Sequence, residues 1–304
     1  IGCSHAIYTA KQVIKGYLKG GDTAHVAAID IAKAFPRVNR DALLAALIKR
    51  NVPVSFIDLI DEWMQRSYFR VKWFNFISDR FSLRTGVNQG SVLAPALFSV
   101  VINDTILACK ASNLGIVIVY ADDVLIITRT RHALQNLFSI VETEIVSVNL
   151  ELNVSKCSCI RIGPRFDKFC IPISSLPGSV INWSSEIKYL GVYLRQASKF
   201  SCATDNAKRG FNRACNSIFG KLLGKASEEV ILHMIKIKCM PILLYGSDVC
   251  DCSNATMQSL DFSVIRFGMK LFRTSNRTTV LDSFENMGFK IPNLCIPLRV
   301  HRFE

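Results

Sequence analysis

Residues 117–128, VIVYADDVLIIT, place two adjacent carboxylates, Asp122 and Asp123, between two apolar runs. Apolar β-branched runs favour strands, whereas aspartate is rare in strands and common in turns. The stretch therefore predicts a β-hairpin that turns at the two acids. Because neighbouring like charges repel each other, a second interpretation is that the hairpin tip holds a metal ion. This stretch alone leaves both interpretations open.

A third carboxylate, Asp30, ends the apolar stretch AHVAAID at residues 24–30. Strand ends in an α+β sheet can bring together side chains that are distant in sequence. Two carboxylates about 4 Å apart repel by about 4 kcal/mol at an effective dielectric constant of about 20. A divalent cation removes this repulsion, and Mg²⁺ prefers oxygen ligands. Two such ions about 3.5–4 Å apart can stabilise the attacking and the leaving oxygen of a phosphoryl transfer.

The charge balance indicates a polyanionic partner. The 304 residues include 37 lysines and arginines against 24 aspartates and glutamates, a formal net charge of +13. This excess favours nucleic acid first and an anionic membrane surface second. The apolar runs at 114–121 and 124–127 are too short to span a bilayer, so no membrane partner is predicted.

The eleven cysteines predict reduced thiols rather than a zinc site. The closest pairs, Cys157 with Cys159 and Cys250 with Cys252, have C-x-C spacing instead of the C-x2-C spacing usual in zinc modules. Thiols packed as small apolar side chains are typical of an intracellular protein. No signal peptide opens the chain, and its start at Ile1 predicts a fragment of a larger protein.

The remaining patterns predict a mixed α/β domain to about residue 195, followed by a basic helical lobe. Asn39 is a candidate cap for one helix, and Pro95 lies near the start of another, where proline is tolerated. The predicted helices cover 9–20, 39–50, 54–66, 90–110, 131–148, 205–224, 227–246 and 259–273. The predicted strands are 24–30, a pair within 68–87, the 117–128 hairpin, one near 157–163 and one at 188–194.

Five ordered motifs resemble those of reverse transcriptases, most closely the non-LTR (LINE-type) retrotransposon enzymes, over residues 3–195. They are AIDIAKAFPRV (28–38), TGVNQGSVLAPALFSVVIND (85–104), YADD (120–123), LNVSKC (152–157) and IKYLGVYL (187–194). The resemblance implies an α+β right-hand polymerase palm, an antiparallel sheet with helices packed on one face. It also implies partial fingers at 1–22, a fingers and palm core at 23–195, and a thumb-like and connecting region at 196–304.

The resemblance assigns catalytic roles by position. Asp30, Asp122 and, less directly, Asp123 match the metal-binding acids, and the carbonyl of Ile31 would complete one metal shell. The implied cofactor is a pair of Mg²⁺ ions, for which Mn²⁺ is an alternative. Lys156 matches a lysine that protonates the departing pyrophosphate. A solvated lysine before a strand is the alternative interpretation of Lys156.

The same resemblance implies a nucleotide site. The backbone of Lys33 and Ala34 would lie under the incoming triphosphate, and the ring of Phe35 would fill the space that a ribose 2′-OH needs. Gln89 would shape the nucleotide pocket, and Gly90 would let the backbone approach the template. An ordinary core aromatic is the alternative for Phe35.

Primer and template contacts are implied further along the chain. The turn Tyr189-Leu190-Gly191 would steady the primer end, and Lys208, Arg209 and Arg213 would bind phosphates of the product duplex. A solvated helix face is the alternative for these three cations. The implied partners are an RNA template, a DNA primer or target, dNTPs and an upstream endonuclease domain in the full-length polyprotein. The expected location is the nucleus and cytoplasm, in a retrotransposon ribonucleoprotein.

The sequence departs from the family pattern in two motifs and lacks a third. Pro36 follows the gate aromatic where most relatives carry an acid, and Asn88 precedes Gln89 where proline or arginine is commoner. The chain also begins after the basic fingers motifs, so this fragment alone is expected to have weak or no activity. The main alternative function is a catalytically inactive, nucleic-acid-binding relic. An RNA-dependent RNA polymerase is disfavoured by Phe35 and YADD, and a group II intron maturase has no support after residue 200.

Overall fold

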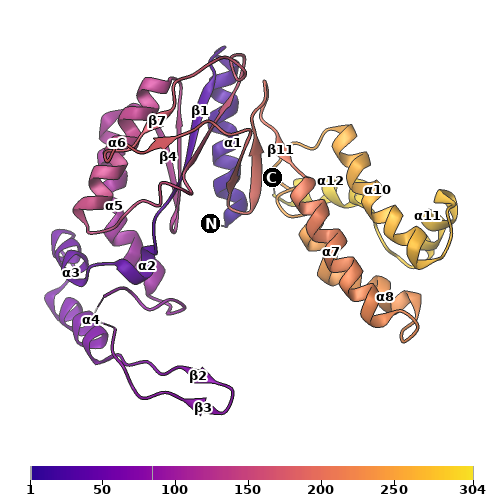
Figure 1. The fold of residues 1–304 in the computed structure, drawn as a ribbon, viewed down its shortest axis with the longest axis horizontal. Coiled ribbons are helices and arrows are strands. Elements are labelled where there is room, and N and C mark those ends of the chain that lie inside the picture. The colour runs from indigo at the N-terminus through magenta and orange to yellow at the C-terminus, as the bar shows by residue number, and fades with distance from the viewer. Residues whose placement is uncertain (1, 84, 304) are drawn as a thin grey trace. The chain divides into compact units, whose positions relative to one another are not determined.

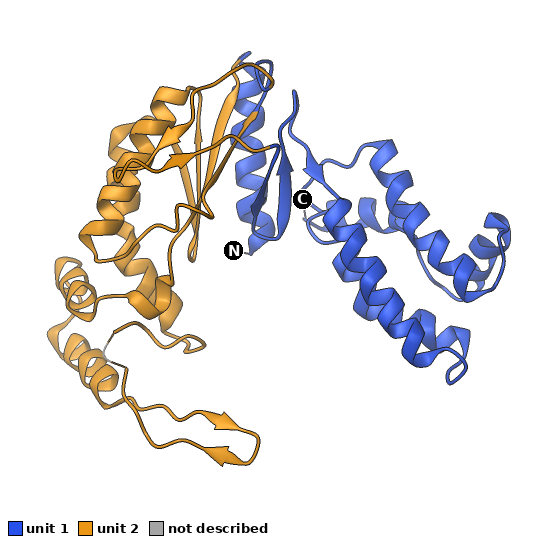
Figure 2. Cartoon of the chain, viewed as in Figure 1, with its two compact units in different colours: residues 1–21, 162–166, 185–304 blue, residues 22–161, 167–184 orange. Residues whose placement is uncertain are grey.

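The computed structural model describes residues 2–83 and 85–303, which form two compact units (Figure 2). Unit 1 contains residues 1–21, 162–166 and 185–304, and unit 2 contains residues 22–161 and 167–184. The break after residue 21 lies one residue from the expected boundary at 22. Residues 185–195, expected in the fingers and palm core, group instead with the C-terminal helices, and so does the N-terminal segment expected as partial fingers.

Unit 2 is built on a four-stranded sheet with the order β4-β5-β1-β6 (Figure 1). The strands are β1 (Ala24–Asp30), β4 (Gly115–Tyr120), β5 (Asp123–Thr128) and β6 (Ser158–Ile162). Strand β5 pairs antiparallel with both β1 and β4. It is buried from Val124 to Thr128, as expected for a central strand of β-branched and apolar residues. The predicted strand at 24–30 and the predicted hairpin at 117–128 are confirmed.

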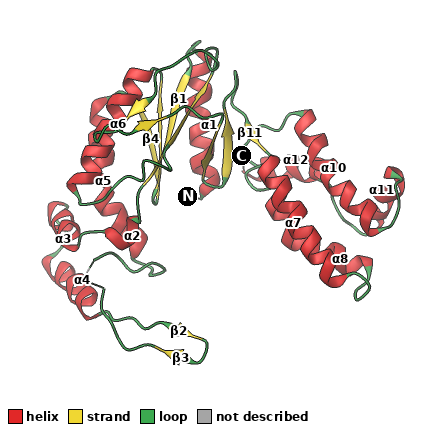
Figure 3. Cartoon of the chain, viewed as in Figure 1, coloured by secondary structure: helices red, strands yellow, loops and turns green. Residues whose placement is uncertain are grey.

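Two long helices pack on this sheet, α5 (Ala94–Ser112) against β4 and α6 (Arg131–Ser147) against β5 and β1 (Figures 1 and 3). Thr130 caps α6, since its hydroxyl accepts a hydrogen bond from the Ala133 N–H at 3.2 Å. The buried side chains of both helices join one apolar core with those of β1 and β5. The predicted α+β class, with helices on the sheet, is confirmed.

Helix α5 is the one helix in the described part of the chain that is long and apolar enough to cross a membrane. The apolar runs noted in the sequence are shorter and lie elsewhere, so they did not identify it. The core helix of a folded domain meets the same criteria, and seven α5 side chains are buried.

The polar face of α5 carries Asp104, which lies 2.9 Å from the Lys49 ammonium and 3.0 Å from the Arg50 guanidinium. The hydrogen bond from Lys49 holds the pKa of the Asp104 carboxyl below its usual value.

The rest of unit 2 consists of short elements. Asn39 caps α3 as predicted, with its side chain accepting from the Ala42 N–H at 3.1 Å. The paired strands predicted within 68–87 are present as a short hairpin. The helices are α2 (Ala34–Arg37), α3 (Arg40–Lys49) and α4 (Val54–Arg66), and the strands are β2 (Lys72–Trp73), β3 (Phe76–Ile77), β7 (Ile173–Ser174) and β8 (Val180–Ile181).

Unit 1 combines one N-terminal helix, a small sheet and a helical lobe. Lysines 11 and 15 of the N-terminal helix form ion pairs with Asp251 at 2.7 and 2.6 Å. The sheet has the order β11-β10-β9, and the helices that follow it share one apolar core. The elements are α1 (Cys3–Lys19), β9 (Glu186–Tyr189), β10 (Val192–Arg195), β11 (Cys202–Ala203), α7 (Asp205–Leu222), α8 (Glu228–Met234), η1 (Ile235–Cys239), α9 (Met240–Leu243), α10 (Asn254–Leu271), α11 (Arg277–Asn286) and α12 (Pro292–Phe303).

Two predictions for unit 1 are wrong. The single strand predicted at 188–194 is a hairpin, because Leu190 and Gly191 adopt left-handed backbone and reverse the chain. The helix predicted at 227–246 is divided into α8, the π-helical η1 and α9. Pro241 has no N–H to donate to the carbonyl four residues earlier, and the helix widens to π geometry just before it. The eleven cysteines are free thiols, as predicted.

Gly86 holds the segment before α5 against α2. Its φ is +83°, and a Cβ at this position would lie 2.5 Å from the carbonyl oxygen of Pro36. Its N–H donates to the Val38 carbonyl at 2.8 Å, and the next N–H, of Val87, donates to the Phe35 carbonyl at 2.9 Å. A residue with a side chain therefore cannot occupy position 86 unless this strap, residues 86 and 87, moves.

We expect Gly86→Ala to lower the free energy of unfolding by at least about 2 kcal/mol, since it adds a backbone clash to the left-handed strain of about 1 kcal/mol. Gly178 in the same unit is a matched control, because its φ is +87° and a Cβ there would meet nothing within 4 Å. Gly178→Ala should cost only about 1 kcal/mol. Urea denaturation of both variants measures the difference, and equal losses would contradict the clash.

Candidate active site

The antiparallel register of β1 and β5 places Asp30 directly opposite Asp123. Directly opposed residues project their side chains from the same face of a sheet, with Cβ atoms about 4.5–5.5 Å apart. Asp122 lies in the two-residue turn between β4 and β5, next to Ala121, whose φ is 52°. Asp30 is half-buried, and Asp122 and Asp123 are exposed. The hairpin therefore brings the three predicted acids to one edge of the sheet.

The backbone of Ile31 is oriented by the segment that lies beside it. Ile31 pairs with Leu152, and the hydrogen bonds run from the Ala32 N–H to the Glu151 carbonyl and from the Asn153 N–H to the Asp30 carbonyl, both at 2.8 Å. This pattern belongs to a non-hydrogen-bonded antiparallel pair. The Ile31 carbonyl therefore points away from Leu152, toward the side on which β1 pairs with β5.

The same segment brings Lys156 to the acids. The Lys156 ammonium lies 3.7 Å from a carboxylate oxygen of Asp30, and both side chains are partly exposed. A solvent-exposed ion pair contributes little to the free energy of folding. Its significance is that it places the Lys156 ammonium beside Asp30. Cys157, the next residue, is a neutral thiol, because burial raises its pKa to about 11. No sequence pattern predicted the contact of Arg37 with Glu151, which joins α2 to this segment.

The residues predicted for the nucleotide site lie at the start of α2, where Lys33 is the N-cap residue, and on the segment between the strap and α5. Lys33 is exposed, with a left-handed φ of 50°, and Ala34 is buried. Phe35 is half-buried and stacks on Phe98, with ring centroids 4.9 Å apart. The Phe35 ring therefore has a fixed support and an accessible part. Pro36 lies in the first turn of α2, where the absence of an N–H is tolerated.

Gln89 and Gly90 form an exposed turn that leads into α5. The φ of Gly90 is +86°, and a Cβ there would meet open space. The hydrogen bonds of Gly86 and Val87 to the backbone of Val38 and Phe35 fix the start of this turn. The two motifs predicted for the nucleotide site are thus held together by the strap.

The predicted primer turn lies in unit 1. Leu190 and Gly191, with φ values of 44° and 82°, form the tight turn between β9 and β10. The Tyr245 hydroxyl donates to the Leu190 carbonyl at 2.9 Å, and a Cβ on Gly191 would lie 2.8 Å from the Tyr245 ring. Tyr189 is buried. No sequence signal identified Tyr245, because its partner is 55 residues away.

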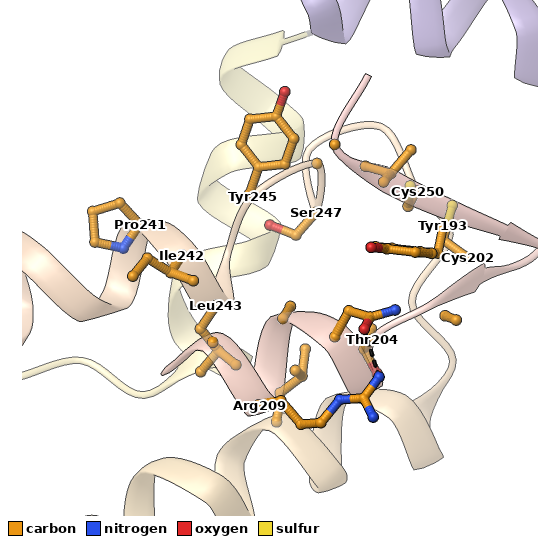
Figure 4. Close-up of a pocket in the computed structure, with 18 of the residues that line it drawn as sticks. Tyr193, Cys202, Thr204, Arg209, Pro241, Ile242, Leu243, Tyr245, Ser247 and Cys250 are labelled. Atoms are coloured by element: carbon orange, nitrogen blue, oxygen red, sulfur yellow. Dashed lines mark hydrogen bonds between the residues drawn. The ribbon is translucent and has the colours of Figure 1, made fainter. Parts of the chain in front are cut away.

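A cavity of about 790 Å³ in unit 1 joins this turn to helix α7 (Figure 4). Gly191, Arg209 and Arg213 are among its lining residues, and the Arg209 guanidinium lies 2.5 Å from the Asn206 side chain. Lys208 has a different setting, because its ammonium pairs with Asp205 at 2.8 Å and donates to the Ser259 hydroxyl at 3.0 Å. Two of the three predicted α7 cations thus line the cavity, whereas Lys208 joins α7 to α10.

The acids fit a divalent cation in chemistry but are not arranged around one here. Within residues 2–83 and 85–303, no three His, Cys, Asp or Glu side chains lie close enough to hold an ion as a group. Carboxylate oxygens of Asp30 and Asp123 on one face, with a backbone carbonyl beside them, are ligands that Mg²⁺ accepts. Coordination by all three acids requires at least one side chain to turn from its position here.

A family model for reverse transcriptase (RNA-dependent DNA polymerase) matches residues 5–194. This chain belongs to the reverse transcriptase family. The match contains the three acids, the strap, Lys156 and the Leu190–Gly191 turn.

Relatives of this reverse transcriptase chain include proteins of mobile elements. It is 26% identical over 233 residues to the RNA-directed DNA polymerase from mobile element jockey of Drosophila melanogaster, covering 73% of this chain and 25% of that protein. It is 24% identical over 218 residues to the Pol polyprotein from the type-2 retrotransposable element R2DM of the same species, covering 66% and 20%. The chain thus spans a quarter or less of the length of these two relatives.

Solved structures of telomerase from Candida tropicalis also resemble this chain. The complex with a fragment of telomeric RNA gives a TM-score of 0.48 at 11% identity, covering 93% of this chain and 52% of that one. The apo form truncated from the C-terminal domain gives 0.47 at 15% identity, covering 66% and 39%.

We expect Mn²⁺ or Mg²⁺ to stabilise unit 2 through the opposed carboxylates. An ion at ten times its dissociation constant should add about 1.4 kcal/mol to the free energy of unfolding. Asp30→Asn and Asp123→Asn should each remove this gain, because each leaves one carboxylate in the pair. Urea denaturation with EDTA or with the ion measures the gain. Asp167→Asn, at an exposed site in the same unit, is the control, and an unchanged gain in Asp30→Asn would contradict the site.

Proposed function

We propose that this chain is the reverse transcriptase core of a LINE-type retrotransposon, adding dNTPs to a primer 3′-OH on an RNA template. The observation that supports this most strongly is the register of β1 and β5. It sets Asp30 opposite Asp123 at the hairpin tip that carries Asp122, and Lys156 lies beside Asp30. The jockey and R2 relatives, which are named as RNA-directed DNA polymerase and retrotransposon Pol proteins, support the same conclusion.

In this proposal Asp30, Asp122, Asp123 and the Ile31 carbonyl hold two Mg²⁺ ions, or Mn²⁺ in their place. When bound, the ions supply positive charge to the attacking primer oxygen and to the leaving pyrophosphate. The acids position these charges on one edge of the sheet. Lys156, whose ammonium lies 3.7 Å from Asp30, donates a proton to the departing pyrophosphate.

The strap and α2 would form the nucleotide site. The backbone at Lys33 and Ala34 supports the triphosphate, and Gln89 and Gly90 line the base and template side. Phe35, held by its stacking on Phe98, excludes a nucleotide that carries a 2′-OH. A ring with a rigid support can exclude the 2′-OH by steric clash, whereas a freely rotating ring would move aside.

The basic lobe would bind the primer and template duplex. The Leu190–Gly191 turn, steadied by Tyr245, contacts the primer end, and Arg209 and Arg213 neutralise phosphates from the same cavity. Tyr189 supports the turn from within the core. The upstream endonuclease domain and a ribonucleoprotein in the nucleus and cytoplasm belong to this proposal through the LINE-type assignment.

We expect Asp122→Asn to abolish Mg²⁺-dependent primer extension on poly(rA)/oligo(dT), a loss of at least about a hundredfold if its carboxylate supports an ion at the reacting phosphate. Asp123→Asn should retain more activity than Asp122→Asn. Asp167→Asn is the control and should keep full activity. The assay compares each variant with the wild-type chain at the same protein concentration.

Retained extension by Asp122→Asn would contradict the proposed role of the acids. If the wild-type chain binds duplex but shows no Mg²⁺-dependent extension, the inactive nucleic-acid-binding relic is favoured instead. Binding and extension measured on the same preparation separate these outcomes.

We expect Phe35→Gly to increase rNTP incorporation relative to dNTP by about tenfold to a hundredfold, because it removes the ring that meets the 2′-OH. Phe98→Leu is a matched variant that removes the stacking partner and leaves the Phe35 ring in place. It should lose stability and part of the preference for dNTPs, because the ring stays but loses its support, so the rNTP ratio should rise less than in Phe35→Gly. Competition between labelled rNTP and dNTP measures the ratio. An unchanged ratio in Phe35→Gly would indicate that Phe35 is only a core aromatic.

A further inference from the structure

The hairpin of β2 and β3 in unit 2 exposes an unusual number of aromatic side chains. Every residue from Arg70 to Leu83 is exposed. Trp73 is 70% exposed, Phe74 81% and Phe76 80%. Side chains at this level of exposure contribute almost nothing to the core. Several exposed aromatic side chains on one short element are typical of a site that contacts a partner.

The backbone presents these rings at the hairpin tip. Trp73 pairs with Phe76 across the two strands, so their side chains share a face. Phe74 occupies the turn with a left-handed φ of 50° and packs edge-on against Trp73, with centroids 5.6 Å apart. A bulky residue in this conformation is strained, and glycine or asparagine is the usual choice. Phe74 therefore has a strained backbone conformation although its ring is exposed to solvent.

Positive charge surrounds the rings. Within residues 68–83 the charged residues are Arg70, Lys72 and Arg80 against one acid, Asp79. The Arg80 guanidinium lies 4.5 Å from the centroid of the Tyr68 ring. Strand alternation places Lys72 on the face opposite Trp73. The hairpin therefore carries aromatic rings and cations on one narrow element. A ligand can contact either face of this element.

Single-stranded nucleic acid matches this combination. Unpaired bases can stack on aromatic rings while their phosphates contact arginine and lysine. A duplex offers the phosphates but keeps its base faces stacked internally. A second copy of this chain, paired hairpin to hairpin, would bring three cations of each copy together. Charge thus favours a polyanion, and the exposed rings favour unpaired bases.

We propose that residues 68–83, the β2–β3 hairpin, form a stacking platform for single-stranded nucleic acid. The platform is separate from the residues proposed for polymerisation. Its binding requires neither a divalent ion nor a dNTP. A failure of the platform and a failure of the polymerase proposal are therefore distinguishable.

The test is the affinity of the full chain for short fluorescein-labelled oligo(rA), oligo(dA) and a blunt-ended duplex, measured by anisotropy in EDTA. Trp73→Ala should weaken single-strand binding at least about fivefold, and Trp73→Phe should retain most of it. Duplex affinity should be unchanged in both variants. Lys72→Ala should weaken binding and lower the salt dependence by about one phosphate contact. Comparison of the two single strands identifies whether RNA or DNA is the better ligand.

Phe169→Ala is the matched control, because Phe169 is 92% exposed in the same unit and lies outside the hairpin. It should leave all three affinities unchanged. The proposal is overturned if Trp73→Ala leaves both single-strand affinities unchanged, or if duplex affinity falls equally. It is also overturned if the wild-type chain is a dimer that Trp73→Ala dissociates without loss of nucleic-acid binding.

Discussion

The antiparallel register between β1 and β5 is the constraint on which the candidate active site depends. A shift of one residue would move every β1 side chain to the opposite face of the sheet. With the register observed, Asp30 opposes Asp123 while the apolar residues of β5 stay in the core. Burial of β5 thus fixes the backbone positions from which the two carboxylates project. The free energy of the core holds this backbone whether or not an ion is bound.

A second set of backbone contacts extends this framework to the residues proposed for the nucleotide. The segment at 151–153 pairs beside Asp30 and Ile31, and the strap at Gly86 and Val87 bonds to the segment that carries Phe35. These are main-chain bonds between regions far apart in sequence. They hold the site while the side chains of Lys33, Gln89 and Lys156 remain at least partly exposed. A site of this design keeps a rigid backbone and side chains free to meet a ligand.

In unit 1, residues of the same type that are adjacent in sequence make different contacts. Lys208 and Arg209 are neighbours on α7, but Lys208 makes an ion pair and a hydrogen bond within the lobe, whereas Arg209 lines the cavity. Tyr245 supports the Leu190–Gly191 turn from a distant position in the sequence. In unit 2, the β2–β3 hairpin carries its aromatic residues outward rather than into the core. The helix and strand patterns predicted none of these distinctions, since periodicity identifies a face but not what covers it.

The sequence by itself determined the local elements and the family. Strand β1, helix α4 and the acidic hairpin follow from apolar runs, helical spacing and turn residues, which are properties of short segments. The ordered motifs identified a reverse transcriptase because catalysis restricts residue type at each position. Only the tertiary structure decided that Asp123 faces Asp30, that Gly86 must fit against Pro36, that 188–194 is a hairpin and that Lys208 turns inward. Each of these depends on long-range pairing or packing, and the free energy of such contacts is not encoded in any one segment.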